Sequence, residues 1–218
     1  GFVFHMVLDP TYPSEELFFH DVTRTLGVEL PSRGLSLVDY RDALQRFLFA
    51  KAISEGQTNV LIIDEAHKLN ELSLEALRIL LNYETTDAKL LQVVLLGQME
   101  LLPVLMELPN LVDRVSFKSV LRPLTPAETH ELIGFRLDEA GYRSPLPLFT
   151  PEAVHTIHEH TDGYPRRIAM VCHQALRHVV MRRDRAVEAG LIRELIQDEI
   201  EAGWLPLKGS TRLQQSSC

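Results

Sequence analysis

The chain has 218 residues, of which 45% are hydrophobic and 24% charged, enough to bury the core of one large domain or of one and a half small ones. Its formal net charge of −8 argues against a protein that binds nucleic acid over its whole surface. Cys172 and Cys218 lie far apart and form neither a disulfide framework nor a metal-ligand motif, which favours a reducing compartment. The sequence has no apolar run long enough to span a bilayer.

Short apolar segments alternate with amphipathic ones in the first part of the chain. Their periods predict strands over 2–8, 59–63, 91–97 and 115–121, and helices over 14–26, 37–55, 72–85 and 100–106. The runs at 59–63 and 91–97 are apolar without alternation, which is typical of parallel strands that are buried on both faces. This order predicts an α/β layer with a mainly parallel sheet.

The character of the sequence changes at Pro123, after which it contains no convincing strand. Helix start signals, among them a capping box at Thr125 and Glu128, predict helices over 125–141, 150–161, 165–183 and 187–201. We therefore expect an α/β core over 1–122, a helical lid over 123–205 and a disordered tail over 206–218.

Two adjacent carboxylates, Asp64 and Glu65, follow the apolar run at 60–63. Open α/β sheets bind their ligands at this carboxyl end of their strands. In phosphoryl-transfer sites the first acid of such a pair holds Mg²⁺, and the second orients and deprotonates the attacking water. The alternative is a strand that merely ends in solvated acids, and we favour the magnesium-and-water site.

Three further polar residues are candidates for the same chemistry. Gln98 follows the next predicted strand, where it could hydrogen-bond a phosphate or the attacking water, although a plain turn residue is the favoured interpretation when Gln98 is taken alone. Arg166 stands in the first turn of a predicted helix, where a cation is unfavourable and invites an anionic partner such as a phosphate; the alternative is a solvated arginine pair with Arg167. Arg114 could reach the phosphate of a neighbouring subunit, or form a surface salt bridge with Asp113 or another acid.

Together these motifs resemble one family. From Phe2 to about Ile200 the chain resembles the AAA+ ATPases of the ExeA/GspA type, which are associated with type II secretion, and their relatives in pilus biogenesis and transposition. The resemblance rests on an ordered series of motifs: LIIDEAH at 61–67, LRILLNYET at 77–85, KLLQVVLLGQ at 89–98, LTPAET at 124–129, LFTPEA at 148–153 and GYPRRI at 163–168.

The resemblance implies a P-loop NTPase-like fold, a three-layer parallel sheet followed by an all-α lid, with ATP and Mg²⁺ as cofactors. Asp64 would be the magnesium ligand and Glu65 the catalytic base of a Walker B pair. Gln98 would be sensor 1, Arg166 the sensor 2 arginine against the nucleotide, and Arg114 an arginine finger supplied in trans.

The same resemblance implies a ring-like homo-oligomer that couples ATP hydrolysis to the assembly or remodelling of a protein complex. Its partner would be a membrane protein of a secretion or pilus system, or a transposase. The expected location is the cytoplasm, at the inner face of a bacterial inner membrane through regions outside this chain.

The sequence departs from the family in one respect, because it contains no G-x-x-x-x-G-K-[ST] loop to cradle phosphates. In the family this loop lies upstream of the segment that matches 2–10. We therefore expect a truncated sequence that binds nucleotide poorly. The strand that feeds the loop would also be missing, so the segments at 93–97 and 115–121 would either pair with each other or receive that strand from the full-length protein.

Three alternative interpretations have some support in the sequence. Residues 64–67 also spell the DEAH box of superfamily 2 helicases, but the helical region after Pro123 leaves no second RecA-like domain. A nucleotide-free scaffold or adaptor is favoured by the missing loop and disfavoured by the intact carboxylates. Nucleic-acid binding through the arginines of 166–185 is the third, and the alternative there is a solvated helix face balanced by the acids of 188–201.

Overall fold

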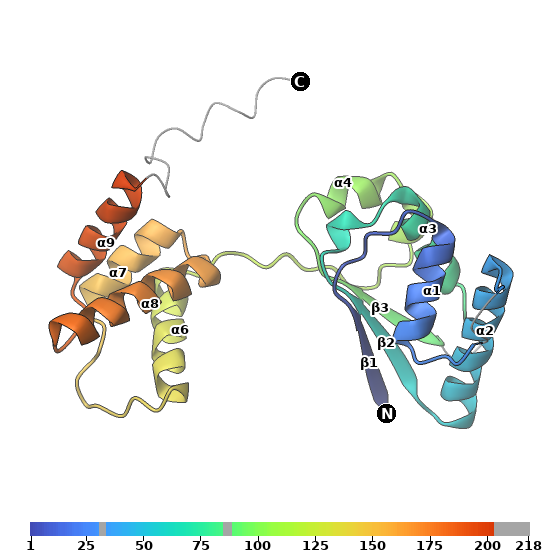
Figure 1. Ribbon diagram of the computed structural model, residues 1–218, viewed down its shortest axis with the longest axis horizontal. Coiled ribbons are helices and arrows are strands. Elements are labelled where there is room, and N and C mark those ends of the chain that lie inside the picture. The colour runs from blue at the N-terminus through green and yellow to red at the C-terminus, as the bar shows by residue number, and fades with distance from the viewer. Residues whose placement is uncertain (31–33, 85–88, 203–218) are drawn as a thin grey trace, which may run out of the picture. The chain divides into compact units, whose positions relative to one another are not determined.

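A computed structural model describes residues 1–30, 34–84 and 89–202 (Figure 1). The chain divides into two compact units, a first unit over Gly1–Lys118 and a second unit over Ser119–Cys218. The tail predicted over 206–218 lies outside the described residues. Within the described ranges, no helix is long and apolar enough to cross a membrane.

The first unit is built on a parallel sheet in the order β1 (Phe2–Val7), β2 (Thr58–Ile63) and β3 (Leu91–Leu95). The helices of this unit are α1 (Glu15–Thr25), α2 (Leu37–Phe49), α3 (Glu71–Leu80), α4 (Leu101–Met106) and α5 (Pro109–Val112). A π-helical turn, η1 (Ala50–Ser54), extends α2, and a 3₁₀ turn, η2 (Ala66–Lys68), follows β2. The α/β order predicted from periodicity is therefore confirmed for these elements.

Side-chain caps fix where the helices of this unit begin. The Ser14 hydroxyl accepts a hydrogen bond from the Leu17 amide at 3.3 Å and starts α1. The Asn70 side chain accepts from the Ser73 amide at 2.9 Å and starts α3. Each cap satisfies a backbone N–H that the helix itself cannot, so short polar side chains mark the helix starts in the sequence.

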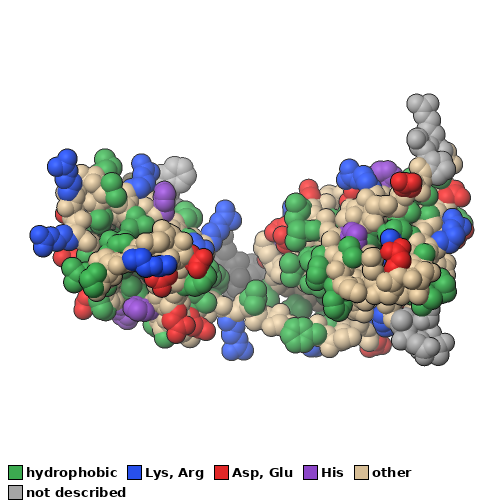
Figure 2. Space-filling model, turned by 90° about the horizontal axis from the view of Figure 1, so that it is seen from below, with side chains coloured by type: hydrophobic (Ala, Val, Ile, Leu, Met, Phe, Trp, Pro, Cys, Tyr) green, Lys and Arg blue, Asp and Glu red, His purple; other side chains and the backbone are tan. Residues whose placement is uncertain are grey.

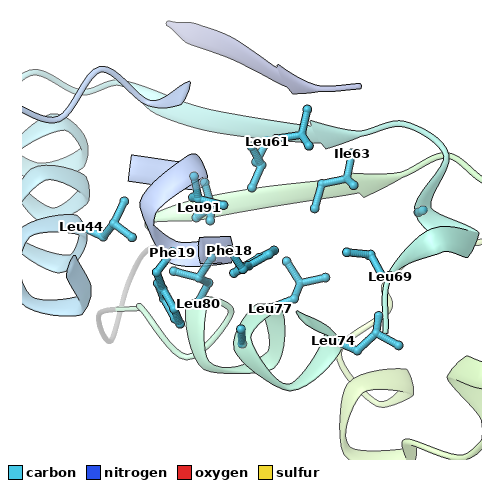
Figure 3. Close-up of a cluster of buried hydrophobic side chains, with 14 of the residues drawn as sticks. Phe18, Phe19, Leu44, Leu61, Ile63, Leu69, Leu74, Leu77, Leu80 and Leu91 are labelled. Carbon is cyan, nitrogen blue, oxygen red and sulfur yellow. The ribbon is translucent and has the colours of Figure 1, made fainter. Parts of the chain in front are cut away.

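The core of the first unit lies between the sheet and the helices (Figure 3). Leu61 and Ile63 of β2 point from the sheet into a layer that α1 and α3 fill with fully buried side chains, among them Phe18 and Leu77. Each such side chain contributes roughly 1.5–3 kcal/mol by leaving water. This packing holds β2 in place and so fixes the position of Asp64 and Glu65, which follow it.

The opposite face of the sheet is open in the described part of the chain. On β1, Phe2 and Phe4 are 69% and 66% exposed, and Val94 on β3 is 40% exposed. The prediction that residues 91–97 form a strand buried on both faces is therefore wrong for these residues. The apolar run reflected one packed face only, because no described helix packs against the other.

The strand predicted over 115–121 does not form. Its apolar side chains Phe117 and Leu121 are 83% and 94% exposed, and among the described strands β3 pairs with β2 alone. A strand needs a neighbour for its backbone N–H and C=O groups, and apolar alternation does not supply one. Of the two outcomes expected for this edge, closure of 93–97 on 115–121 is not what the structure adopts.

The second unit contains α6 (Pro126–Glu139), α7 (Pro151–Thr161), α8 (Pro165–Arg182) and α9 (Ala189–Glu201), which confirms the helices predicted there. Ile157, Ile168 and Ile192 are buried to 1% exposure or less and lie at the centre of a separate hydrophobic cluster. This unit therefore has its own core, with the start of α8 anchored by Ile168.

The capping box that begins α6 makes the stability of the second unit depend on pH. The Thr125 amide donates to the Glu128 carboxylate at 2.8 Å, and this bond, with a second from the Thr125 hydroxyl, lowers the pKa of Glu128 below its ordinary value of 4.5. A carboxyl whose pKa falls on folding stabilises the native state above the unfolded pKa, and this contribution is lost as the pH falls through and below it.

We therefore expect Glu128→Ala to lower the stability of the second unit at neutral pH, and the difference from the wild type to vanish in acid. Urea unfolding followed between about pH 7 and pH 3 measures it. Glu131→Ala, at an exposed glutamate one turn further along α6, is the matched control and should show no such convergence. If Glu128→Ala lowers the free energy of unfolding by the same amount in acid as at neutral pH, the ionised Glu128 carboxylate does not stabilise this cap.

Candidate active site at the carboxyl end of the sheet

Asp64 is held at the end of β2 by the sheet itself. Its backbone N–H donates to the Val7 carbonyl at 2.9 Å, so the parallel pairing of β1 and β2 continues through this residue. One carboxylate oxygen, Oδ1, accepts the Glu65 amide at 2.8 Å. The side chain is half-buried, and within the described ranges no hydrogen bond is made by its Oδ2. The Oδ2 atom of Asp64 is therefore a hard carboxylate oxygen that is available to bind a metal ion.

Glu65 has a left-handed backbone, with φ of 51° and ψ of 33°. This conformation costs a residue with a Cβ roughly 1–2 kcal/mol, and such residues concentrate at functional sites. The turn is maintained by hydrogen bonds on either side, from the Ala66 amide to the Leu96 carbonyl at 2.8 Å and from the Lys68 amide to the Glu65 carbonyl at 2.9 Å. The two carboxylates therefore leave the backbone in different directions and can serve different partners.

Gln98 lies at the end of the neighbouring strand, as the parallel order predicts. The backbone N–H of Gln98 donates to Nδ1 of His67 at 3.4 Å. On the other side of the same ring, Nε2 lies 3.5 Å from Oε2 of Glu65. The ends of β2 and β3 are therefore joined through one imidazole. From the sequence, His67 was part of the LIIDEAH motif and of the DEAH spelling but was given no role, although its place two residues after the carboxylate pair could have suggested one.

A glycine lets the two strand ends approach this closely. A Cβ on Gly97 would lie 3.1 Å from the His67 amide nitrogen and 3.2 Å from the Leu101 side chain. Such contacts are tighter than those that side chains normally make, so any larger residue would push the turn after β3 away from η2. Gly97 thus helps to set the distance between Gln98 and the carboxylates.

The Arg114 side chain contacts a residue of its own unit, the first unit. Its Nη1 donates to the Leu81 carbonyl at 3.4 Å, where Leu81 is the C-cap of α3, and the guanidinium also helps Lys89 to lower the pKa of Glu84. A cation at a helix C-terminus is stabilising because it complements the helix dipole. The ion pair with Asp113 that the sequence suggested is not among those of the described residues.

Arg166 belongs to the second unit, where it is exposed in the first turn of α8. Its neighbour Arg167 lies 3.6 Å from the Asp162 carboxylate and stacks on the Tyr164 ring at 5.4 Å. In the described ranges, no ion pair or hydrogen bond is made by the Arg166 guanidinium. Of the two adjacent arginines, Arg166 is therefore the one left available for an anion.

The basic stretch of α8 is partly neutralised within the second unit. The Arg182 guanidinium holds the Glu194 carboxylate of α9 with bonds of 2.6 and 3.0 Å, which raise the pKa of Arg182 and lower that of Glu194. On the face drawn in Figure 2, Lys and Arg side chains stand apart, with acidic and hydrophobic side chains between them. For Arg182 the structure agrees with a helix face balanced by the acids of α9.

Comparison with known proteins shows which family this chain is similar to. Residues 2–105 match the family model of the AAA domain. Over 137 residues, 62% of this chain and 24% of its relative, the sequence is 39% identical to General secretion pathway protein A of Aeromonas hydrophila. These two matches support an AAA+ ATPase of the ExeA/GspA type. The family expected from the ordered motifs is thereby confirmed.

Solved structures agree on the fold of this AAA+ chain. The ORC2 protein of Aeropyrum pernix, solved as ADPNP–ADP complexes, gives a TM-score of 0.65 at 16% identity, over 90% of this chain and 52% of that one. The RuvB Holliday junction branch migration motor of Thermotoga maritima gives 0.56 at 14% identity, over 89% and 52%. These likenesses confirm the P-loop NTPase-like fold. The AAA+ chain spans about half the length of these proteins and about a quarter of General secretion pathway protein A.

The donor set of the AAA+ chain suits one side of a magnesium–nucleotide site. Within the described ranges, no cluster of three or more His, Cys, Asp or Glu side chains could hold a metal alone. Mg²⁺ is ordinarily bound by one or two carboxylates, with waters and phosphate oxygens completing the shell, so the available oxygen of Asp64 fits this use. The glycine-rich phosphate cradle, in contrast, is not found in the sequence.

Proposed function

We propose that this AAA+ chain contributes the metal-binding and water-activating part of an ATP-hydrolysing module. The observation that carries the proposal is that Asp64 and Glu65 follow β2, and that the His67 ring contacts both Glu65 and the Gln98 backbone after β3. The sheet fixes the backbone of Asp64, and a left-handed turn holds Glu65. The backbone N–H of Gln98 contacts the same His67 ring that lies beside Glu65. The carboxyl end of the strands is the place at which open α/β sheets bind ligands.

Each of these side chains would have a separate task. Asp64 would hold Mg²⁺, which when bound supplies positive charge against the phosphates. Glu65 would accept a proton from the attacking water, and general-base action of this kind contributes roughly 10²- to 10⁴-fold in rate. The Gln98 amide would orient the water or a phosphate oxygen through hydrogen bonds.

Two arginines would complete the charge balance. Arg166 would contact the nucleotide phosphates from the lid, and its exposed guanidinium, which has no hydrogen-bond or ion-pair partner among the described residues, supports this role. Arg114 would act in trans within a homo-oligomer, where a finger arginine contributes roughly 10³- to 10⁵-fold. To do so it would exchange its bond to the Leu81 carbonyl for a phosphate of the neighbouring subunit.

We infer that hydrolysis drives the assembly or remodelling of a protein complex in a secretion-type pathway. The support is the identity of 39% with General secretion pathway protein A. The partner would be a membrane component of that system, reached from the cytoplasmic side. A transposase or nucleic-acid partner has less support, because the Arg182–Glu194 pair neutralises part of the basic stretch.

Mg-ATP binding and hydrolysis should be measured on this chain and on any longer product that its native gene encodes. We expect the longer product to bind and hydrolyse ATP, and this chain to bind weakly because its sequence has no phosphate-cradling loop. If neither protein binds nucleotide, the AAA+ fold serves as a nucleotide-free scaffold or adaptor and the proposal is wrong.

A further inference from the structure

One side chain that the proposed chemistry does not use lies between the residues that it does use. The His67 ring has Nδ1 at 3.4 Å from the Gln98 amide nitrogen and Nε2 at 3.5 Å from Oε2 of Glu65. Its side chain is only 18% exposed, whereas that of Glu65 is 43% exposed. The imidazole is thus a partly buried link between a more exposed carboxylate and the backbone that follows β3.

The two contacts fix the proton on this ring. The Gln98 backbone N–H can only donate, so Nδ1 must carry a lone pair and accept. In the neutral ring the proton then resides on Nε2, which faces the acceptor oxygen of Glu65. A single tautomer therefore satisfies both contacts, and the opposite one would place two donors together at Gln98 and two acceptors together at Glu65.

The backbone around His67 leaves the ring little freedom to move elsewhere. The 3₁₀ turn η2 is closed by the bonds from Lys68 to Glu65 at 2.9 Å and from Leu69 to Ala66 at 3.1 Å. On the other side, Gly97 approaches the His67 amide so closely that a Cβ would be 3.1 Å away. The turn η2 is held between the ends of β2 and β3. The position of Glu65, which the His67 ring contacts, therefore depends on the position of the end of β3.

We propose that His67 is a positioning residue: its Nε2–H donates to Glu65 and its Nδ1 accepts from Gln98, so that the imidazole sets the direction of the Glu65 carboxylate relative to the end of β3. This inference rests on the proposed role of Glu65 as the general base. A base must lie within hydrogen-bond reach of the proton it accepts, and misplacement by about 1 Å can cost roughly 100-fold in rate.

Two amide substitutions in the full-length protein separate the ring's contacts. His67→Gln can place an NH₂ group where Nε2 donates to Glu65, and His67→Asn can only place an oxygen where Nδ1 accepts from Gln98. We expect His67→Asn to lower kcat by about 10- to 100-fold with an unchanged KM for ATP, as losses of orienting residues do. His67→Gln should recover most of that loss.

Lys68→Ala is the matched control, because Lys68 shares η2 but points to Asp9 at 3.4 Å, and its kcat should equal that of the wild type. Equal activity of both His67 variants and the wild type would overturn the proposal. So would a change confined to KM, or a loss in His67→Gln that His67→Asn does not show.

A readout without turnover keeps the inference separate from the proposed function. The ¹⁵N chemical shifts of the His67 ring, measured on the unmodified protein at about pH 8 where a free imidazole is neutral, report its tautomer directly. We expect the Nε2–H form, and an Nδ1–H form would overturn the positioning role. If ATP is not hydrolysed at all, the role of Glu65 fails while this measurement still decides whether His67 makes the two contacts.

Discussion

Glu65→Gln is expected to remove nearly all ATP turnover from the full-length protein while leaving nucleotide binding intact. Glutamine matches glutamate in size and can keep the left-handed turn and the place beside His67, but its amide cannot accept a proton from water. Loss of a general base costs roughly 10²- to 10⁴-fold in kcat. Steady-state hydrolysis together with the equilibrium Kd for Mg-ATP measures both halves of the prediction.

Two controls define what this result means. Asp64→Asn changes the adjacent side chain, and because Asp64 is proposed to hold the metal, its main effect should be weaker Mg²⁺-dependent binding. Glu71→Gln, at an exposed glutamate in the first turn of α3, should change neither binding nor turnover. A Glu65→Gln protein that hydrolyses ATP within a few-fold of the wild type would show that the base lies elsewhere.

Gly163→Ala is expected to destabilise the second unit severely. Gly163 has a φ of +74°, and a Cβ there would lie 2.1 Å from the Leu124 carbonyl oxygen. The positive φ costs an alanine about 1–2 kcal/mol, and relief of the overlap costs about 1–3 kcal/mol more. Because the overlapping atom belongs to the backbone, the segment at Leu124 has to shift.

The shift should also affect the position of Arg166. The Leu124 amide donates to the Gly163 carbonyl at 2.8 Å, which ties the chain entering α6 to the turn that begins α8. Gly134→Ala is the matched control, because Gly134 lies inside α6 with no atom within 4 Å of a new Cβ. That change should stabilise by about 0.5–1 kcal/mol. Thermal unfolding of both variants tests the contrast, and equal effects would contradict it.

The elements whose cause is local could be predicted from the sequence. The caps at Ser14, Asn70 and Thr125 are short-range contacts between a side chain and its own first turn, so they could be read from the sequence. The apolar run before Asp64 marked β2, and the next apolar run marked β3, which pairs with β2 in parallel and precedes Gln98. The family also followed from the order of motifs, since that order is a property of the sequence.

Contacts between distant segments decided the rest. The segment over 115–121 has the alternation of a strand but no neighbouring strand to bond, and pairing cannot be read from one segment alone. Arg114 contacts a carbonyl 33 residues earlier in the chain, which only the folded path of α3 brings near. His67 links Glu65 to Gln98 because two parallel strands end side by side and Gly97 lets them approach. Local periodicity thus specified the elements and their order, whereas close packing between them set the contacts of the site.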